Sequence, residues 1–213
     1  MRNKKLLILT AGVTVLPILA GLVLWGALPD RIATHFNFAG EADGWSGKAF
    51  AVFGLPLILL AVHLVCVFAL RLDPRNENVS DKILSLVFWI CPATSIFANG
   101  TVYLYAMGTA VNISYFGMLF AALLFIFVGN YLPKCRQNYT VGIKLPWTLA
   151  DEENWDRTHR FAGWLWIAAG FLLVCLQLMN MLRAWSFMAL VLAMVLLPAA
   201  YSVLLYLKKK KEK

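Results

Sequence analysis

The sequence predicts an all-α integral membrane protein built as a bundle of six transmembrane helices. Of its 213 residues, 61% are hydrophobic and 14% are charged, whereas a soluble domain carries about 25% charged residues. The mean hydropathy is correspondingly high, at +0.72. The few charges also fall between apolar runs of about 18 residues or more, which is the length of a membrane span.

Six apolar runs lie at residues 6–28, 50–70, 83–107, 113–132, 161–179 and 186–207. Each approaches the ~20 residues that a helix needs to cross ~30 Å of hydrocarbon. A helix is expected because a single span in lipid can satisfy its backbone hydrogen bonds only within itself. We therefore expect one membrane domain over residues 1–213, with ordered loops at 29–48 and 133–160.

The distribution of lysine and arginine predicts that both termini face the cytoplasm. With the N-terminus inside, 16 of the 19 basic residues fall on inner segments, as the positive-inside rule requires. These residues face anionic lipid, so the net charge of +8 does not indicate nucleic-acid binding. The run Lys208–Lys211 is expected to be a topology anchor. A cleaved signal peptide is the alternative for the first run, but that run is too long and lacks a small-residue cleavage site.

The outer loop, residues 29–48, contains an alternating pattern that is typical of an extended segment with one aromatic face. Gly40, the Asp43-Gly44 pair and Gly47 are turn signals. We expect an ordered element that faces a ligand; the alternative is a solvated connector, which needs no aromatic stripe. A pH-sensing or metal-binding role for His35 stays open. The alternating apolar or hydroxyl-bearing positions are Ile32, Thr34, Phe36 and Phe38.

The inner loop, residues 133–160, is predicted to contain a short helix that leads into the fifth span. Thr148 followed by Asp151 is similar to a capping box, and the acidic residues that follow suit the positive end of the helix dipole. Trp147 and Trp155 are expected to hold this helix at the membrane interface.

The spans contain little chemistry. None has an acidic or basic residue in its interior, whereas ion-coupled transporters usually place such groups near the midplane. Asn99 and Gln177 are expected to join helices, and His63 is expected to pack in a neutral, hydrogen-bonded state. His159 is expected to be an interfacial polar or structural hydrogen-bonding residue. The sequence contains no HExxH, GxSxG or Walker pattern and no CxxC pair. We therefore expect no enzyme, no metal site and no cofactor.

Two groups of residues carry a resemblance to a known family. The inner loop resembles the SdpI family through Gly129-Asn130, Asn138, Gly142-Ile143-Lys144, Pro146-Trp147-Thr148, Trp155 and Thr158-His159-Arg160. The outer loop is similar to the small domain of unknown function at the N-terminus of that family, through Leu28-Pro29-Asp30-Arg31-Ile32, His35-Phe36, Gly40, Gly44-Trp45 and Lys48.

This resemblance implies a multi-pass immunity protein of the bacterial cytoplasmic membrane that protects against a secreted peptide toxin of the sporulation-delaying type. It also implies that the inner face can capture a small winged-helix repressor. The candidate toxin-facing residues are Pro29, His35, Phe36, Phe38, Gly40, Gly44, Trp45 and Lys48. The candidate signalling or structural residues are Asn130, Asn138, Gly142, Pro146, Trp147, Thr148, Trp155, Thr158, His159 and Arg160.

Two other classes of protein remain as alternatives. One is a small multi-pass transporter or lipid-interacting permease, which would need a polar cavity between spans. The other is an intramembrane enzyme. The uncharged spans count against the first class, and the missing catalytic motifs count against the second.

Overall fold

The computed structural model describes residues 4–212 and consists of two compact units. The first unit runs to Ala69 and resumes over Leu84–Phe116; the second comprises Leu70–Ile83 and the chain from Gly117 onward. The unit boundaries fall inside helices, so three of the long helices contribute residues to both units. Each unit is described by itself.

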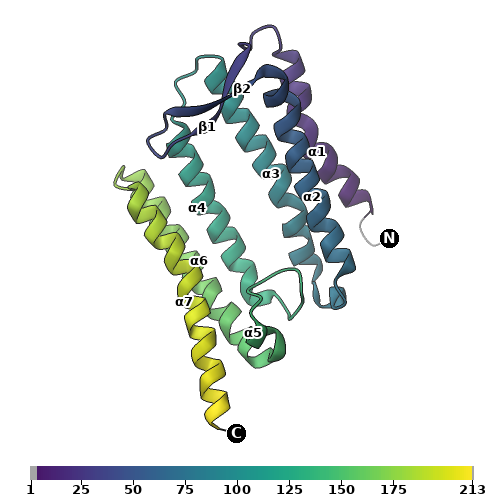
Figure 1. Cartoon of the computed structure of the whole chain (residues 1–213), viewed down its shortest axis with the longest axis vertical. Helices are drawn as coiled ribbons and strands as arrows, with labels where there is room; N and C mark the ends of the chain where they lie inside the picture. Colours follow the sequence, from purple (N-terminus) through teal and green to yellow (C-terminus); the bar gives the residue numbers. More distant parts are fainter. Residues whose placement is uncertain (1–3, 213) are drawn as a thin grey trace. The chain divides into compact units, whose positions relative to one another are not determined.

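The first unit packs three long helices beside one another, with a two-stranded sheet at one end (Figure 1). The helices are α1 (Lys4–Val23), α2 (Leu55–Leu72) and α3 (Asp81–Ala106). The strands are β1 (Arg31–Phe36) and β2 (Ala42–Gly47), and a π-helical turn over Phe50–Gly54 leads into α2.

The second unit contains α4 (Ile113–Tyr131), the short α5 (Pro146–Ala150), α6 (Glu152–Leu178) and α7 (Ala184–Lys211). Two single 3-10 turns lie at Asn76–Asn78 and Leu132–Lys134. α6 and α7 lie side by side, and α5 packs at the end where α6 begins (Figure 1).

Within residues 4–212, six helices are long and apolar enough to cross a membrane, which confirms the predicted multi-span helical class. The fifth of these helices begins earlier than expected, at Glu152 rather than at residue 161. Asp151 is its N-cap and accepts a hydrogen bond from the Glu153 amide at 3.2 Å. Thr148 was expected to start this helix, but it lies inside α5, where its hydroxyl accepts the Leu145 amide at 2.9 Å.

The predicted extended segment is strand β1, which pairs antiparallel with β2 from Arg31 opposite Gly47 to Phe36 opposite Ala42. Of the predicted turn residues, Gly40 lies in the turn and the others do not. Asp43, Gly44 and Gly47 are strand residues, and the chain reverses around Gly40, whose φ of 84° is in the left-handed region that glycine tolerates.

Glycines bring α4 and α6 into backbone contact. A Cβ on Gly129 would lie 3.0 Å from the carbonyl oxygen of Gly163, and a Cβ on Gly163 would lie 2.8 Å from that of Gly129. Two turns along the helices, a Cβ on Gly170 would lie 3.0 Å from the carbonyl oxygen of Ala122. Small residues at such positions allow membrane helices to approach closely and gain van der Waals contact.

Buried hydroxyl groups join the helices of the first unit. The Thr10 hydroxyl lies 3.0 Å from His63 Nε2, and the Ser95 hydroxyl donates to the Thr14 carbonyl at 2.7 Å. His63 is thus hydrogen-bonded as expected. Asn99 differs from the expectation, because its amide donates to the Ser95 carbonyl of its own helix at 2.8 Å.

Candidate functional site: a docked hairpin and a latched loop

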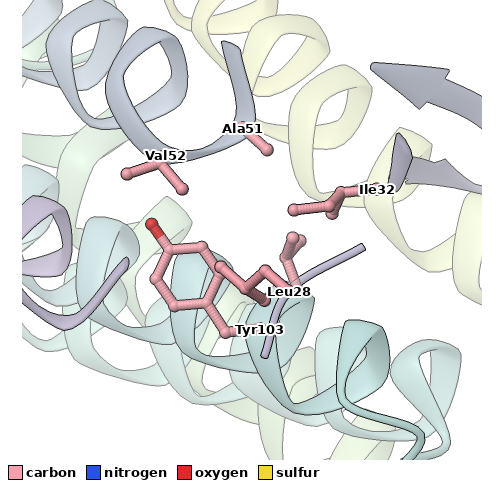
Figure 2. Packing of buried hydrophobic residues seen from close by; sticks show 6 residues of the cluster. Leu28, Ile32, Ala51, Val52 and Tyr103 are labelled. Atoms are coloured by element: carbon pink, nitrogen blue, oxygen red, sulfur yellow. The ribbon is translucent and has the colours of Figure 1, made fainter. Parts of the chain in front are cut away.

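The β-hairpin, residues 31–47, is docked on the first unit by an apolar cluster. Ile32 is completely buried, and the residues around it come from the start of the hairpin, the π-helical turn and α3 (Figure 2). Because the cluster joins segments far apart in sequence, it fixes the hairpin to the helices. Its buried members are Leu28, Ile32, Ala51, Val52, Val102 and Tyr103.

The aromatic residues of the hairpin divide into two groups. Phe36 packs inward, with its ring edge-on to Tyr105 at a centroid distance of 4.9 Å. Phe38 is 51% exposed and Trp45 is 50% exposed. The predicted aromatic face is therefore interrupted, because Phe38 lies beyond the end of β1. Phe36 holds the hairpin, while Phe38 and Trp45 offer apolar surface.

Polar contacts fix both ends of the hairpin. At the turn, Asn37 Oδ1 accepts the amides of Ala39 and Glu41 at 2.9 and 3.0 Å. At the base, Lys48 Nζ lies 3.4 Å from Asp30 Oδ1 and donates to the Trp25 carbonyl at 3.2 Å. Lys48 thus stabilises the base of the hairpin through these two contacts.

His35 and Gly44 face each other across the strands. His35 Nδ1 lies 2.5 Å from Asp43 Oδ1, and both side chains are largely exposed. A Cβ on Gly44 would lie 2.7 Å from the Cβ of His35, so only glycine fits there. Within residues 4–212, no group of three metal-ligating side chains includes His35.

The latched loop, residues 135–151, is organised around Asn138, which is fully buried. Its Oδ1 accepts the Thr140 and Val141 amides at 2.9 and 2.7 Å. Its Nδ2 donates to the Arg136 and Val141 carbonyls at 2.8 and 3.0 Å. One side chain thereby hydrogen-bonds four backbone groups of the loop.

Two residues connect this loop to the segment between α2 and α3. Asp73 accepts the Tyr139 amide at 2.8 Å and the Thr140 hydroxyl at 2.6 Å. Desolvation by burial raises the pKa of Asp73, but the hydrogen bonds from Thr140, Arg75 and Tyr139 outweigh it, so the pKa lies below its ordinary value. Gln137 Oε1 accepts from the guanidinium of Arg75.

Trp155 and His159 on α6 support the other side of the loop. Trp155 is completely buried, its indole N–H donates to the Cys135 carbonyl at 2.7 Å, and its ring stacks on His159 at 4.0 Å. His159 Nε2 accepts the Ile143 amide at 2.8 Å, so Nδ1 carries the proton and donates to the Trp155 carbonyl. Gly142 has φ 122°, and a Cβ there would meet the Trp155 ring at 3.0 Å.

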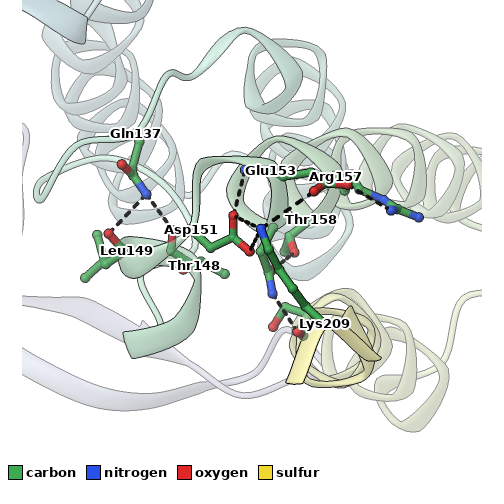
Figure 3. Close-up of polar contacts among 10 residues, drawn as sticks. Gln137, Thr148, Leu149, Asp151, Glu153, Arg157, Thr158 and Lys209 are labelled. Atoms are coloured by element: carbon green, nitrogen blue, oxygen red, sulfur yellow. Dashed lines mark hydrogen bonds and ion pairs between the residues drawn. The ribbon is translucent and has the colours of Figure 1, made fainter. Parts of the chain in front are cut away.

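The end of the loop is tied to α7. The Trp147 indole N–H donates to the Ser202 hydroxyl at 2.8 Å, and Asn154 Nδ2 donates to the Ser202 carbonyl at 2.9 Å. Lys209 Nζ lies 2.9 and 2.8 Å from the two carboxylate oxygens of Asp151 (Figure 3). Lys209 was expected to serve only as a topology anchor, but it also pairs with the N-cap of α6.

The structure divides the predicted inner residues by exposure. Most hold the loop: Asn138, Thr148, Trp155, Thr158 and His159 are buried, and Gly142 and Trp147 are half-buried. The exposed ones are Asn130, Pro146 and Arg160. Sequence reasoning missed Asp73, Gln137 and Asn154, and the only local signal was polar residues beside a long loop. Among the predicted outer residues, Pro29 is exposed at the entry to β1.

Comparisons with known proteins agree with this arrangement. Residues 134–206 match the SdpI/YfhL protein family, and residues 12–60 match a domain of unknown function, DUF1648. The immunity protein SdpI of Bacillus subtilis (strain 168) is 24% identical over 171 residues, which cover 78% of this chain and 78% of the relative. No solved structure matches the chain.

The six apolar helices and the matched segments define a multi-pass protein of the cell membrane. The similarity to the SdpI family lies in the second unit, and the similarity to DUF1648 lies in the N-terminal part of the chain. The first match contains the whole latched loop but not its partners Asp73, Arg75 and Lys209, and the second contains the hairpin.

Proposed function

We propose that this protein protects the cell that makes it from a secreted peptide toxin acting on the membrane, and that the β-hairpin meets the peptide. The observation that carries the proposal is the pair of exposed aromatic side chains, Phe38 and Trp45, on an otherwise tightly docked hairpin. A rigid element that exposes aromatic rings offers contact area at low cost in conformational entropy. A secreted amphipathic peptide is a partner of matching chemistry.

The experiment is survival of a sensitive bacterial strain challenged with a sporulation-delaying peptide toxin. Expression of the wild-type chain is expected to protect, and the double variant Phe38→Ala, Trp45→Ala to protect much less at equal membrane abundance. Trp185→Ala is the matched control, because Trp185 is 75% exposed and belongs to α7 rather than to the hairpin. Full protection by the double variant would show that the hairpin does not recognise the peptide.

The proposal includes the predicted topology, with both termini in the cytoplasm. The hairpin follows one span and the latched loop follows four, so they would lie on opposite sides of the bilayer. Reporter fusions at the C-terminus and at residues 80–82 are expected to report the cytoplasm. If the reporter at either position lies on the outer side, the predicted topology is wrong. The hairpin could then not be assigned to the side from which the toxin arrives.

We further propose that the cytoplasmic face can capture a small winged-helix repressor when toxin is bound. Most of the predicted inner residues are buried, so partner contact is assigned to the exposed Asn130, Pro146 and Arg160. Coupling between the two faces would require an element with two arrangements that both partners bias; α3, with Pro92 inside it, and α6 are the candidates.

A repressor-controlled reporter tests this second role. Arg160→Ala is expected to reduce toxin-dependent derepression without loss of protection, whereas Arg183→Ala, which removes an exposed arginine from the α6–α7 connection, is expected to leave it unchanged. Equal derepression in wild type and Arg160→Ala would remove Arg160 from the proposed contact.

A further inference from the structure

A pocket of about 370 Å³ lies in the second unit, where the start of α6 meets the end of α7. It shares residues with the latched loop, but the buried Asn138 at the centre of the loop does not line it. The pocket is lined on one side by α5 and on the other by the last turns of α7. Its lining residues are Trp147, Ala150, Asp151, Tyr206, Lys209 and Lys210.

The charges of the pocket leave one cation in excess. Asp151 is neutralised by Lys209, whose Nζ contacts both of its carboxylate oxygens within 2.9 Å. The hydrogen bond from Lys209 also lowers the pKa of Asp151, so this carboxyl group is ionised at neutral pH. Within residues 4–212, Lys210 makes no ion pair, and it supplies the excess positive charge.

The apolar wall of the pocket is aromatic and fixed. The rings of Trp147 and Tyr206 lie 6.0 Å apart, centroid to centroid. The indole N–H of Trp147 is held by the Ser202 hydroxyl at 2.8 Å, which sets the orientation of the ring. Tryptophan and tyrosine are enriched at the depth of the lipid headgroups, where one part of the ring is apolar and another is hydrated.

The position of the pocket along α7 places it at the same depth. α7 is an apolar helix that ends in four consecutive lysines, so the membrane boundary falls within its last turns. Leu204 and Leu207, which precede the lysines in α7, are exposed and suit contact with acyl chains. A ligand of the pocket would thus have an anionic head beside Lys210 and an apolar tail along α7.

We propose that this pocket binds the phosphate group of an anionic phospholipid, which Lys210 holds by a charge-assisted hydrogen bond. The lipid would bridge α5 and the end of α7 and so stabilise the latched loop from outside its buried core. A general attraction of the lysine tail to anionic membranes would not depend on which lysine is present. The pocket makes Lys210 different from its neighbour Lys211.

The experiment uses the full chain, purified in a zwitterionic detergent, and titrates it with phosphatidylglycerol, with phosphatidylcholine or with inorganic phosphate. The readouts are the thermal unfolding midpoint and lipid retention by native mass spectrometry. Phosphatidylglycerol is expected to raise the midpoint and to remain bound. Lys210→Gln should weaken this binding about tenfold, which is the loss expected for one charge-assisted hydrogen bond.

Two further variants separate the pocket from general electrostatics and from misfolding. Lys211→Gln removes the same charge one residue away and should change the affinity little. Ala150→Phe fills the pocket without changing any charge and should abolish lipid retention. The proposal fails if Lys210→Gln and Lys211→Gln weaken binding equally, if Ala150→Phe binds as the wild type does, or if inorganic phosphate or phosphatidylcholine gives the same stabilisation.

Discussion

The β-hairpin and the latched loop are both short segments between membrane helices, but different forces hold them. The hairpin is docked by apolar side chains around Ile32, and its polar contacts lie near the surface. The latched loop is held by buried side chains that bind backbone groups, with Asn138 and Asp73 as its centres. The hairpin exposes the aromatic side chains of Phe38 and Trp45, whereas the loop buries most of its distinctive residues.

This difference matters for how each region can function. Because buried apolar contacts hold the hairpin in place, its exposed side chains can be substituted without loss of those contacts. A buried polar network is satisfied in one arrangement only, and removal of one member leaves its partners unpaired. The loop is therefore expected to respond as a unit, and mutations in it should cost more stability than mutations on the hairpin.

The largest effect is expected for Trp155→Ala in the loop. This change removes a completely buried indole that stacks on His159 and binds the Cys135 carbonyl. The free energy of unfolding should fall by about 3–5 kcal/mol. Thermal unfolding in detergent measures the loss, and Trp164→Ala is the control because Trp164 is 70% exposed. Similar losses for the two tryptophans would contradict the described packing.

A smaller loss is expected for Gly44→Ala in the hairpin. The new methyl group would meet the Cβ of His35 across the strands, and the overlap should cost about 1–3 kcal/mol. Gly47→Ala is a matched control in the same strand, since a Cβ there has open space. If the two alanine variants unfold at the same temperature, the strand register is wrong.

The third prediction uses pH to test the loop. The folded-state pKa of Asp73 lies below its ordinary value of 3.8, so its contribution to stability is present above that pH and disappears as the pH falls through the folded pKa. Wild type should unfold at a higher temperature than Asp73→Asn at pH 7, and the difference should shrink as the pH falls below 3.8 and vanish below the folded-state pKa. A difference independent of pH would mean that the Asp73 charge does not hold the loop.

The smallest effect on stability is expected for Trp45→Ala. The side chain is half exposed, so the free energy of unfolding should change by about 0.5 kcal/mol or less. Protection against toxin should nevertheless fall, which separates recognition from folding. Unfolding midpoints and survival measured on the same preparations provide the check, and a large loss of stability would place Trp45 in the core of the hairpin.

Local patterns in the sequence identified much of the fold and less of the site. The apolar runs identify the helices, because lipid leaves a lone span no other way to satisfy its backbone. The alternation from Ile32 to Phe36 identifies β1, but Gly44 was assigned to a turn because glycine signals both turns and close strand contacts. The partners of Asn138 are near in sequence, yet nothing local marks that residue as buried.

The contacts of Asp73 with Tyr139 and Thr140 span more than sixty residues. Such pairs cannot be read from periodicity or spacing, because the fold alone brings them together. The same is true of Ser202, which binds Trp147 and Asn154 from another helix. The family resemblance marked the loop residue Trp147 but not its distant partner Ser202.

The glycine contacts between α4 and α6 limit which conformational changes the second unit can undergo. Backbones that touch at Gly129–Gly163 and again at Ala122–Gly170 cannot come closer, and separation would expose small residues that offer lipid little contact surface. The two helices should therefore behave as one stiff strut. If α6 tilted or shifted along its axis, α4 would move with it. The latched loop that joins the two helices would then move with them as part of one rigid body and would not act as a hinge.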